Sequence, residues 1–117
     1  MSYPLLWLRA FAITLFIEEA IAVPLLKPIE PSVMRRIGMV LVANVATHPL
    51  VWFFFPHLGW SWGTVVVVAE AWAVGFEVLV YALMSKMTKS APLSRCIAAS
   101  ALANAGSYLV GMIASRW

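Results

Sequence analysis

The sequence predicts an all-α integral membrane protein, built as a single bundle of four transmembrane helices. Of its 117 residues, 63% are hydrophobic and only 11% are charged, which leaves too little polar surface for a soluble domain of this length. Most of the chain falls into four apolar stretches that each approach the roughly 20 residues needed to cross a bilayer. Their length and lack of strict alternation predict helices and not barrel strands.

Short segments rich in helix-breaking or polar residues separate the four stretches. We place the spans at about residues 4–26, 36–55, 63–84 and 93–115. Prolines mark the first two connections, and the third is polar with serine, lysine and proline. No segment remains that is long enough for a separate soluble domain, so we expect residues 1–117 to form one transmembrane domain.

The basic residues predict how the chain is oriented. They cluster in the first and third connections, on one side of the membrane: Lys27, Arg35, Arg36, Lys86, Lys89 and Arg95. The positive-inside rule makes that side cytoplasmic, so both termini should face the non-cytoplasmic side of a bacterial inner membrane. The opposite helix ends carry residues that suit an aromatic interfacial belt: Tyr3, Trp7, Trp60, Trp62 and Trp117. The net charge of +3 then reflects topology and anionic lipid, and no nucleic-acid partner is expected.

Two segments align without a gap and predict an internal repeat. Residues 35–48 read RRIGMVLVANVATH and residues 95–108 read RCIAASALANAGSY, so Asn44 aligns with Asn104. With a one-residue shift in the connection, each hairpin carries a glutamate followed by one of these asparagines. Both hairpins cross the membrane in the same sense, which predicts two tandem αα-hairpins related by a pseudo-twofold axis along the membrane normal. Chance similarity between apolar helices is the alternative.

Acidic residues inside the spans are the strongest functional signal. Four of the five acids lie within spans: Glu18, Glu19, Glu70 and Glu77. A charged acid at mid-helix costs about 2.5–3.5 kcal/mol, so four unpaired charges would rival the roughly 5–15 kcal/mol that stabilises a whole domain. We therefore expect these acids to be paired, protonated, hydrated or bound to a ligand. The repeat aligns Glu18 with Glu77 and favours Glu18, over its neighbour Glu19, as the residue that faces the bundle axis.

Counting residues from the outer surface arranges the polar side chains in layers. The predicted intramembrane binding site contains Glu18, Asn44, His48, Glu70, Glu77 and Asn104. At about 1.5 Å per residue, His48 and Glu70 lie in the outer layer, the asparagines near the middle, and the other two glutamates deeper. A structural ion pair between Arg9 and Glu70, with His48 alongside, is the alternative for the outer layer.

The same side chains are candidates for a metal site. His48 and Glu70 supply nitrogen and oxygen ligands suited to Zn²⁺, Fe²⁺ or Mn²⁺. Glu70 and Glu77 are, however, about 10 Å apart along their helix axis, and the sequence contains neither paired Glu-x-x-His nor HExxH motifs. His48 is also available as a single axial ligand for haem or chlorophyll, and no cofactor is assigned from the sequence.

A stripe of small residues on the last span permits close approach of another helix. It consists of Ala99, Ala103, Ser107 and Gly111. The stripe is explained either by tight packing inside one bundle, or by dimerisation or docking onto a larger membrane complex. The expected partners are therefore the lipid bilayer and either a second copy of the chain or other membrane subunits.

Three functions are compatible with these features. The first is a protein that binds or passes protons, a cation or a small solute, with protonation of Glu18 or Glu77 as the coupling event. The second is a non-catalytic accessory subunit of a larger respiratory, photosynthetic or transport complex. The third is an intramembrane enzyme that uses His48 with Glu70 or Glu77 as acid and base on a lipid-like substrate. No nucleophile or metal motif accompanies that third set, so a non-enzymatic function is favoured.

Overall fold

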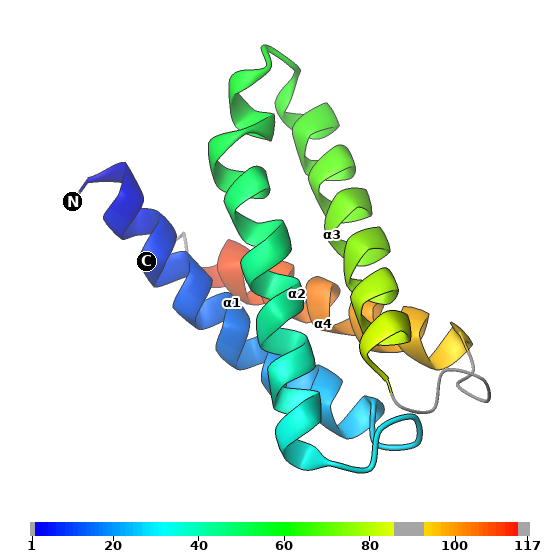
Figure 1. Ribbon diagram of the computed structural model, residues 1–117. Helices are drawn as coiled ribbons and strands as arrows, with labels where there is room; N and C mark the ends of the chain where they lie inside the picture. The colour runs from blue at the N-terminus through cyan, green and yellow to red at the C-terminus, as the bar shows by residue number, and fades with distance from the viewer. Residues whose placement is uncertain (1, 86–92, 115–117) are drawn as a thin grey trace.

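The computed structural model describes residues 2–85 and 93–114, and all regular structure in these ranges is helical. The elements are α1 (Tyr3–Leu25), α2 (Val33–Phe53), the short 3₁₀ helix η1 (Phe55–His57), α3 (Trp62–Met84) and α4 (Leu93–Ala114) (Figure 1). The all-α prediction is thus confirmed. The largest difference in bounds is at the start of the second helix, which was expected at residue 36 and begins at Val33.

Serine caps explain where α2 and α3 begin. The Ser32 hydroxyl accepts a hydrogen bond from the Arg35 amide at 3.3 Å, and the Ser61 hydroxyl accepts one from the Thr64 amide at 3.3 Å. Each cap satisfies one of the amide groups that a helix leaves unpaired in its first turn. Arg35 therefore lies in the first turn of α2, whereas the sequence analysis assigned it to the connection.

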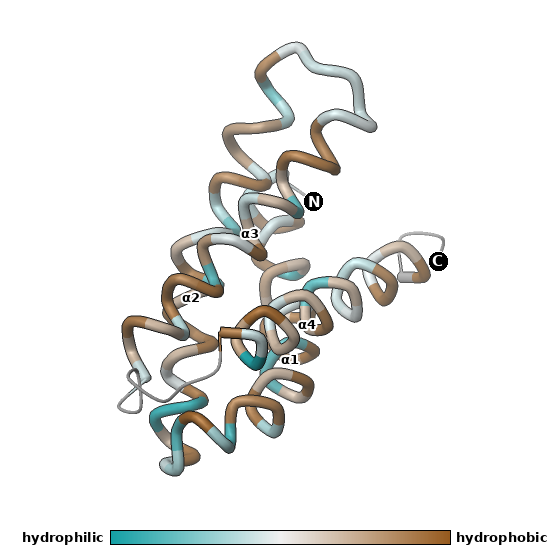
Figure 2. The backbone as a smooth tube through the Cα atoms, turned by 90° about the vertical axis from the view of Figure 1, so that its right-hand side faces the viewer, coloured by the Kyte–Doolittle hydropathy of each residue, from teal (hydrophilic) through white to brown (hydrophobic). Residues whose placement is uncertain are grey.

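The four helices pack as two pairs. α1 packs most extensively against α4, and α2 packs most extensively against α3, while contacts within each hairpin are fewer. Figures 1 and 2 show α2 and α3 running side by side and leaning away from α1 and α4. The pairs come together where the α1–α2 connection lies, around a buried core that includes Leu26, Ile29, Met39, Val40 and Tyr81.

Within residues 2–85 and 93–114, three helical segments are long and apolar enough to cross a membrane: Val33–His57, Trp62–Met84 and Leu93–Ile113. Large apolar side chains are exposed along each of the four helices, as expected for a surface that faces lipid, and Figure 2 shows hydrophobic residues distributed around the helices. These features indicate an integral membrane protein. α1 has 23 residues and is long enough to cross, but it carries Arg9, Glu18 and Glu19.

Candidate functional site

A cavity of about 630 Å³ lies between the four helices; we call it the central cavity. The residues of the predicted intramembrane site all line it: Glu18, Asn44, His48, Glu70, Glu77 and Asn104. Apolar and aromatic side chains form much of the remaining wall, among them Leu6, Ile13, Val51, Trp52, Trp62 and Tyr108. The helices thus bring six residues from distant parts of the sequence to one cavity.

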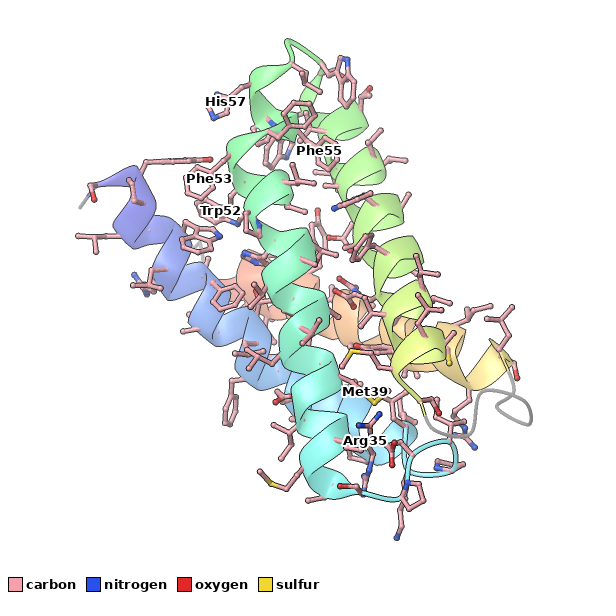
Figure 3. The ribbon with its side chains drawn as sticks, viewed as in Figure 1. Arg35, Met39, Trp52, Phe53, Phe55 and His57 are labelled. Carbon is pink, nitrogen blue, oxygen red and sulfur yellow. The ribbon has the colours of Figure 1, made fainter. Side chains whose placement is uncertain are left out.

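The cavity has an upper and a lower end. Trp52 lines the cavity in the half of α2 that leads to the α2–α3 connection, which we call the upper end, and Arg35 lies at the opposite end of α2 (Figure 3). On α1 and α3, the cavity-lining residues nearest to the Arg35 end are Glu18 and Glu77, and we call their side chains the floor of the cavity. Below the floor, the buried core that contains Leu26 and Tyr81 fills the space between the helices. The structure is therefore closed on the Arg35 side of the two carboxyl groups.

Glu77 is buried on α3, with 1% of its surface exposed. The Asn104 side-chain amide on α4 donates a hydrogen bond to Glu77 Oε1 at 2.8 Å. The Ser100 hydroxyl lies 3.3 Å from the same oxygen, and the Thr47 hydroxyl on α2 lies 3.4 Å from Oε2. Polar groups from two neighbouring helices therefore surround this carboxyl group, and its strongest contact is the amide of Asn104.

Glu18 on α1 is also buried, with 1% of its surface exposed, but it is less well satisfied. The Ser107 hydroxyl donates a hydrogen bond to Glu18 Oε2 at 3.2 Å, whereas the buried Oε1 accepts none. Asn44 lies beside this carboxyl group. Its amide nitrogen donates to the Val40 carbonyl at 2.9 Å, and its buried side-chain oxygen accepts no hydrogen bond. Two buried acceptors therefore remain unfilled at the floor.

The carboxyl groups of Glu18 and Glu77 lie close enough to interact electrostatically. Two adjacent carboxylates repel, and a hydrogen bond between carboxyl groups needs a proton on one of them. Among residues 2–85 and 93–114, the ion pair within 4 Å joins Arg35 to Glu30, at 2.8 Å. No basic side chain in these ranges forms an ion pair with Glu18 or Glu77. A shared proton or a bound cation is therefore the chemical means of stabilising it.

The surroundings of the two glutamates follow one pattern. Each carboxyl group lies beside the asparagine of its own hairpin and a hydroxyl group of the other hairpin. The two sets are Glu18 with Asn44 and Ser107, and Glu77 with Asn104 and Thr47. These are also the residues that align in the sequence.

His48 lies higher in the cavity and has an aromatic neighbourhood. The indole N–H of Trp7 donates a hydrogen bond to His48 Nδ1 at 3.0 Å, so Nδ1 carries no proton and the neutral ring carries its proton on Nε2. Phe11 lies edge-on with ring centroids 5.3 Å apart, and Trp52 stacks with centroids 6.5 Å apart. Trp7 thus fixes the tautomer of a cavity histidine, whereas the sequence analysis assigned it to the interfacial belt.

The outer charged residues share the cavity wall without a direct ion pair. Arg9 is exposed and Glu70 is half-buried, and both line the central cavity. Over the described ranges, Arg9 and Glu70 do not come within 4 Å of each other as an ion pair, whereas Arg35 and Glu30 do. The cavity separates α1 from α3 at this level, which accounts for the unpaired charges. Glu19 is half-buried and, unlike Glu18, is not among the residues that line the cavity.

The basic residues at the Arg35 end are held by local acceptors. Arg35 bonds to Glu30 and to the Met84 carbonyl, and the Arg36 guanidinium donates to the Val23 carbonyl at 2.7 Å. These partners lie in the α1–α2 connection and at the ends of α1 and α3. The arginines therefore stabilise the closed end of the bundle and do not neutralise the carboxyl groups at the cavity floor.

The metal candidates do not form a cluster. In the part of the chain that the structure describes, no group of three or more His, Cys, Asp or Glu side chains is arranged to hold a metal ion. Cys96 is buried and free, and it packs in the apolar core below the floor. His48 and Glu70 therefore remain single ligand candidates on separate helices.

The small-residue stripe of α4 faces the interior of this chain. Ala99 and Ala103 are fully buried in the core, Ser107 contacts Glu18, and Gly111 lines the central cavity. Ala99, Ala103 and Ser107 therefore pack within the bundle, whereas Gly111 is exposed and a Cβ there would meet nothing within 4 Å.

Comparisons with protein-family models, with curated proteins and with solved structures find no match for this chain. A functional assignment therefore depends on the chemistry of the central cavity. Its distinguishing features are the neighbouring carboxyl groups of Glu18 and Glu77, the unfilled acceptor oxygens of Glu18 and Asn44, and the mainly apolar wall above.

Proposed function

We propose that this protein binds a proton or another cation at the Glu18–Glu77 carboxyl pair and passes it across a membrane. The observation that carries this function is the carboxyl pair itself, buried at the floor of a cavity and without a basic partner among the described residues. Charged groups at membrane depth are costly, and those that occur mark ion pathways and proton relays. Because the two carboxyl groups need a proton or a cation between them to be stable, they are suited to bind and release such a charge.

This function requires four spans, with α1 as one of them. At about 1.5 Å per residue, the 23 residues of α1 exceed the roughly 30 Å hydrocarbon thickness. Its apolar side chains face outward, as at Leu5, Leu8 and Phe16, whereas Glu18 faces the interior. We place both termini and the upper end of the cavity on the non-cytoplasmic side of a bacterial inner membrane, because the arginines hold the closed end.

Alternating access provides a route past the closed end. We propose that the chain is a tandem repeat of two αα-hairpins, supported by the matching contacts around Glu18 and Glu77. The repeat relates α1 to α3 and α2 to α4, so the packing of α1 against α4 corresponds to the packing of α3 against α2. Rocking these pairs about the carboxyl groups would close the upper end and open the Arg35 end, as repeats do around a fixed site in transporters.

Proton flux into liposomes tests this function. Purified protein is reconstituted into vesicles that contain a pH-sensitive dye, and a potassium diffusion potential is imposed. The wild-type protein is expected to conduct protons, Glu77→Gln to abolish the flux, and Glu19→Gln to retain it because Glu19 does not line the cavity. The melting temperature of each variant verifies folding.

Loss of flux in both Glu77→Gln and Glu19→Gln would contradict a specific function of the carboxyl pair. It would show that flux depends on the total negative charge of the bundle. Absence of flux in the wild-type protein, with other subunits retained after purification from native membrane in mild detergent, would instead support the accessory-subunit alternative. Turnover of an added lipid that His48→Ala removes would support the enzyme alternative.

A further inference from the structure

We propose that the central cavity takes an organic monoammonium compound, with its N–H groups on the Glu18–Glu77 floor and its apolar part against the wall above. This inference deepens the proposed function, on which it rests, by naming the class of the cation. It depends on three features of the cavity: the charge of the floor, the unfilled acceptors, and the size and composition of the wall.

The charge of the floor matches one positive charge. A carboxyl pair that shares one proton has a net charge of −1. The other polar groups at this level are neutral, namely the asparagines of α2 and α4 and the hydroxyl groups of Thr47 and Ser107. Arg9 lies nine residues from Glu18, about 13 Å along a helix, and the Arg36 guanidinium is bonded to the Val23 carbonyl of α1. Within the described residues, neither arginine forms an ion pair with the carboxyl groups of the floor.

The unfilled acceptors favour a cation that donates hydrogen bonds. Glu18 Oε1 and the side-chain oxygen of Asn44 are buried without a hydrogen-bond partner, and both residues are 1% exposed and line the cavity. Leaving such acceptors unpaired costs about 1–3 kcal/mol each. A primary or secondary ammonium group carries a positive charge and at least two N–H donors. It fills both acceptors, whereas a quaternary ammonium has no donor to offer.

The cavity is too large for a proton or a bare metal ion alone. Its volume of about 630 Å³ lies inside the roughly 300–1,000 Å³ range of sites for small organic ligands. Above the floor, apolar and aromatic side chains form much of the wall, including Ile13, Val51, Trp52 and Tyr108. The polar side chains of Arg9, His48 and Glu70 also line it. Burial of an apolar ligand body against these side chains contributes about 25 cal/mol per Å². An amphipathic amine therefore fits both ends of the cavity.

Binding of four matched compounds to the protein in lipid nanodiscs tests the inference. The probes are 2-phenylethylammonium, its N,N,N-trimethyl analogue, neutral 2-phenylethanol and anionic 3-phenylpropionate, followed by isothermal titration calorimetry and by tryptophan fluorescence. Charge-assisted hydrogen bonds contribute about 1.5–3 kcal/mol each. We therefore expect the primary ammonium to bind roughly 10- to 100-fold more tightly than the alcohol and the trimethyl analogue, and the carboxylate not to bind.

Variants separate the floor from the remainder of the bundle. Glu18→Gln and Asn44→Leu should each weaken binding of the primary ammonium by about tenfold or more, while Glu19→Gln should bind as the wild type does. Thermal unfolding of each variant verifies folding. Equal affinity for the alcohol would show a site for neutral amphiphiles or lipid and overturn the inference. Equal affinity for the trimethyl analogue, or unchanged binding in Glu18→Gln, would also overturn it.

The two proposals fail separately. Proton flux that depends on Glu77, without binding of the primary ammonium, would refute the ammonium inference and leave the proposed function intact. Selective binding of the primary ammonium without flux of any cation would support the ammonium site and refute transport.

Discussion

Replacing Asn104 with leucine tests how the buried carboxyl group of Glu77 is held. The Asn104 amide donates to Glu77 Oε1 at 2.8 Å and to the Ser100 carbonyl of its own helix at 2.8 Å. Leucine removes the donor that links α4 to α3, while the remaining hydroxyl contacts of Glu77, at 3.3 and 3.4 Å, are long. Asn104→Leu should therefore destabilise the protein.

The expected magnitude follows from this single contact between helices. Side-chain hydrogen bonds between membrane helices average about 0.6 kcal/mol, with a maximum near 1.7 kcal/mol, and hydrogen bonds to charged groups lie higher, at about 1.5–3 kcal/mol. For a short bond to a buried carboxyl group we expect a loss of about 1–2 kcal/mol. The bond to Ser100 contributes little, because that carbonyl belongs to the same helix.

Asn44→Leu is the matched control, because Asn44 aligns with Asn104 but is bonded differently. Its amide donates to Val40, one turn earlier in its own helix, and its side-chain oxygen is buried without a partner. Removal of an unsatisfied acceptor relieves a cost, so Asn44→Leu should be neutral or stabilising. The assay is reversible unfolding in mixed micelles by a denaturing detergent. Equal destabilisation by both variants, or none by Asn104→Leu, would refute this account of the floor.

Two further changes test the packing around the cavity. Trp7→Phe keeps an aromatic ring but removes the N–H donor to His48, so it should lower the free energy of unfolding by about 0.5–1.5 kcal/mol. ¹⁵N NMR of labelled histidine should then show a mixture of tautomers in place of the Nε2–H form. An unchanged spectrum would contradict the assigned bond. Gly106→Leu should destabilise the protein by about 1–3 kcal/mol, because a Cβ there would lie 2.5 Å from Ile21 Cδ1. Gly75→Leu is the control in the same unfolding assay and should be tolerated, because a Cβ there would meet nothing within 4 Å.

Local sequence signals were sufficient to locate the helices. A bilayer-length apolar stretch must satisfy its backbone internally, so it becomes a helix whatever its neighbours are. Prolines and polar residues then mark where each helix ends, and Ser32 and Ser61 could have refined the starts of α2 and α3 as capping residues. Among the adjacent acids, the alignment of Glu18 with Glu77 singled out the one that the structure places in the cavity.

The neighbours of each polar side chain were decided by the tertiary structure alone. Helices that are apolar on nearly every face carry little periodic information about which face is buried, so the sequence did not predict the Trp7–His48 bond or the Arg35–Glu30 pair. The sequence by itself determined the four helices, three of which are long and apolar enough to cross a membrane, and the presence of acids within the helices. Rotation and crossing of the helices then determined that Glu18 and Glu77 lie close together at the floor of a cavity, because this proximity depends on the relative placement of segments far apart in the chain.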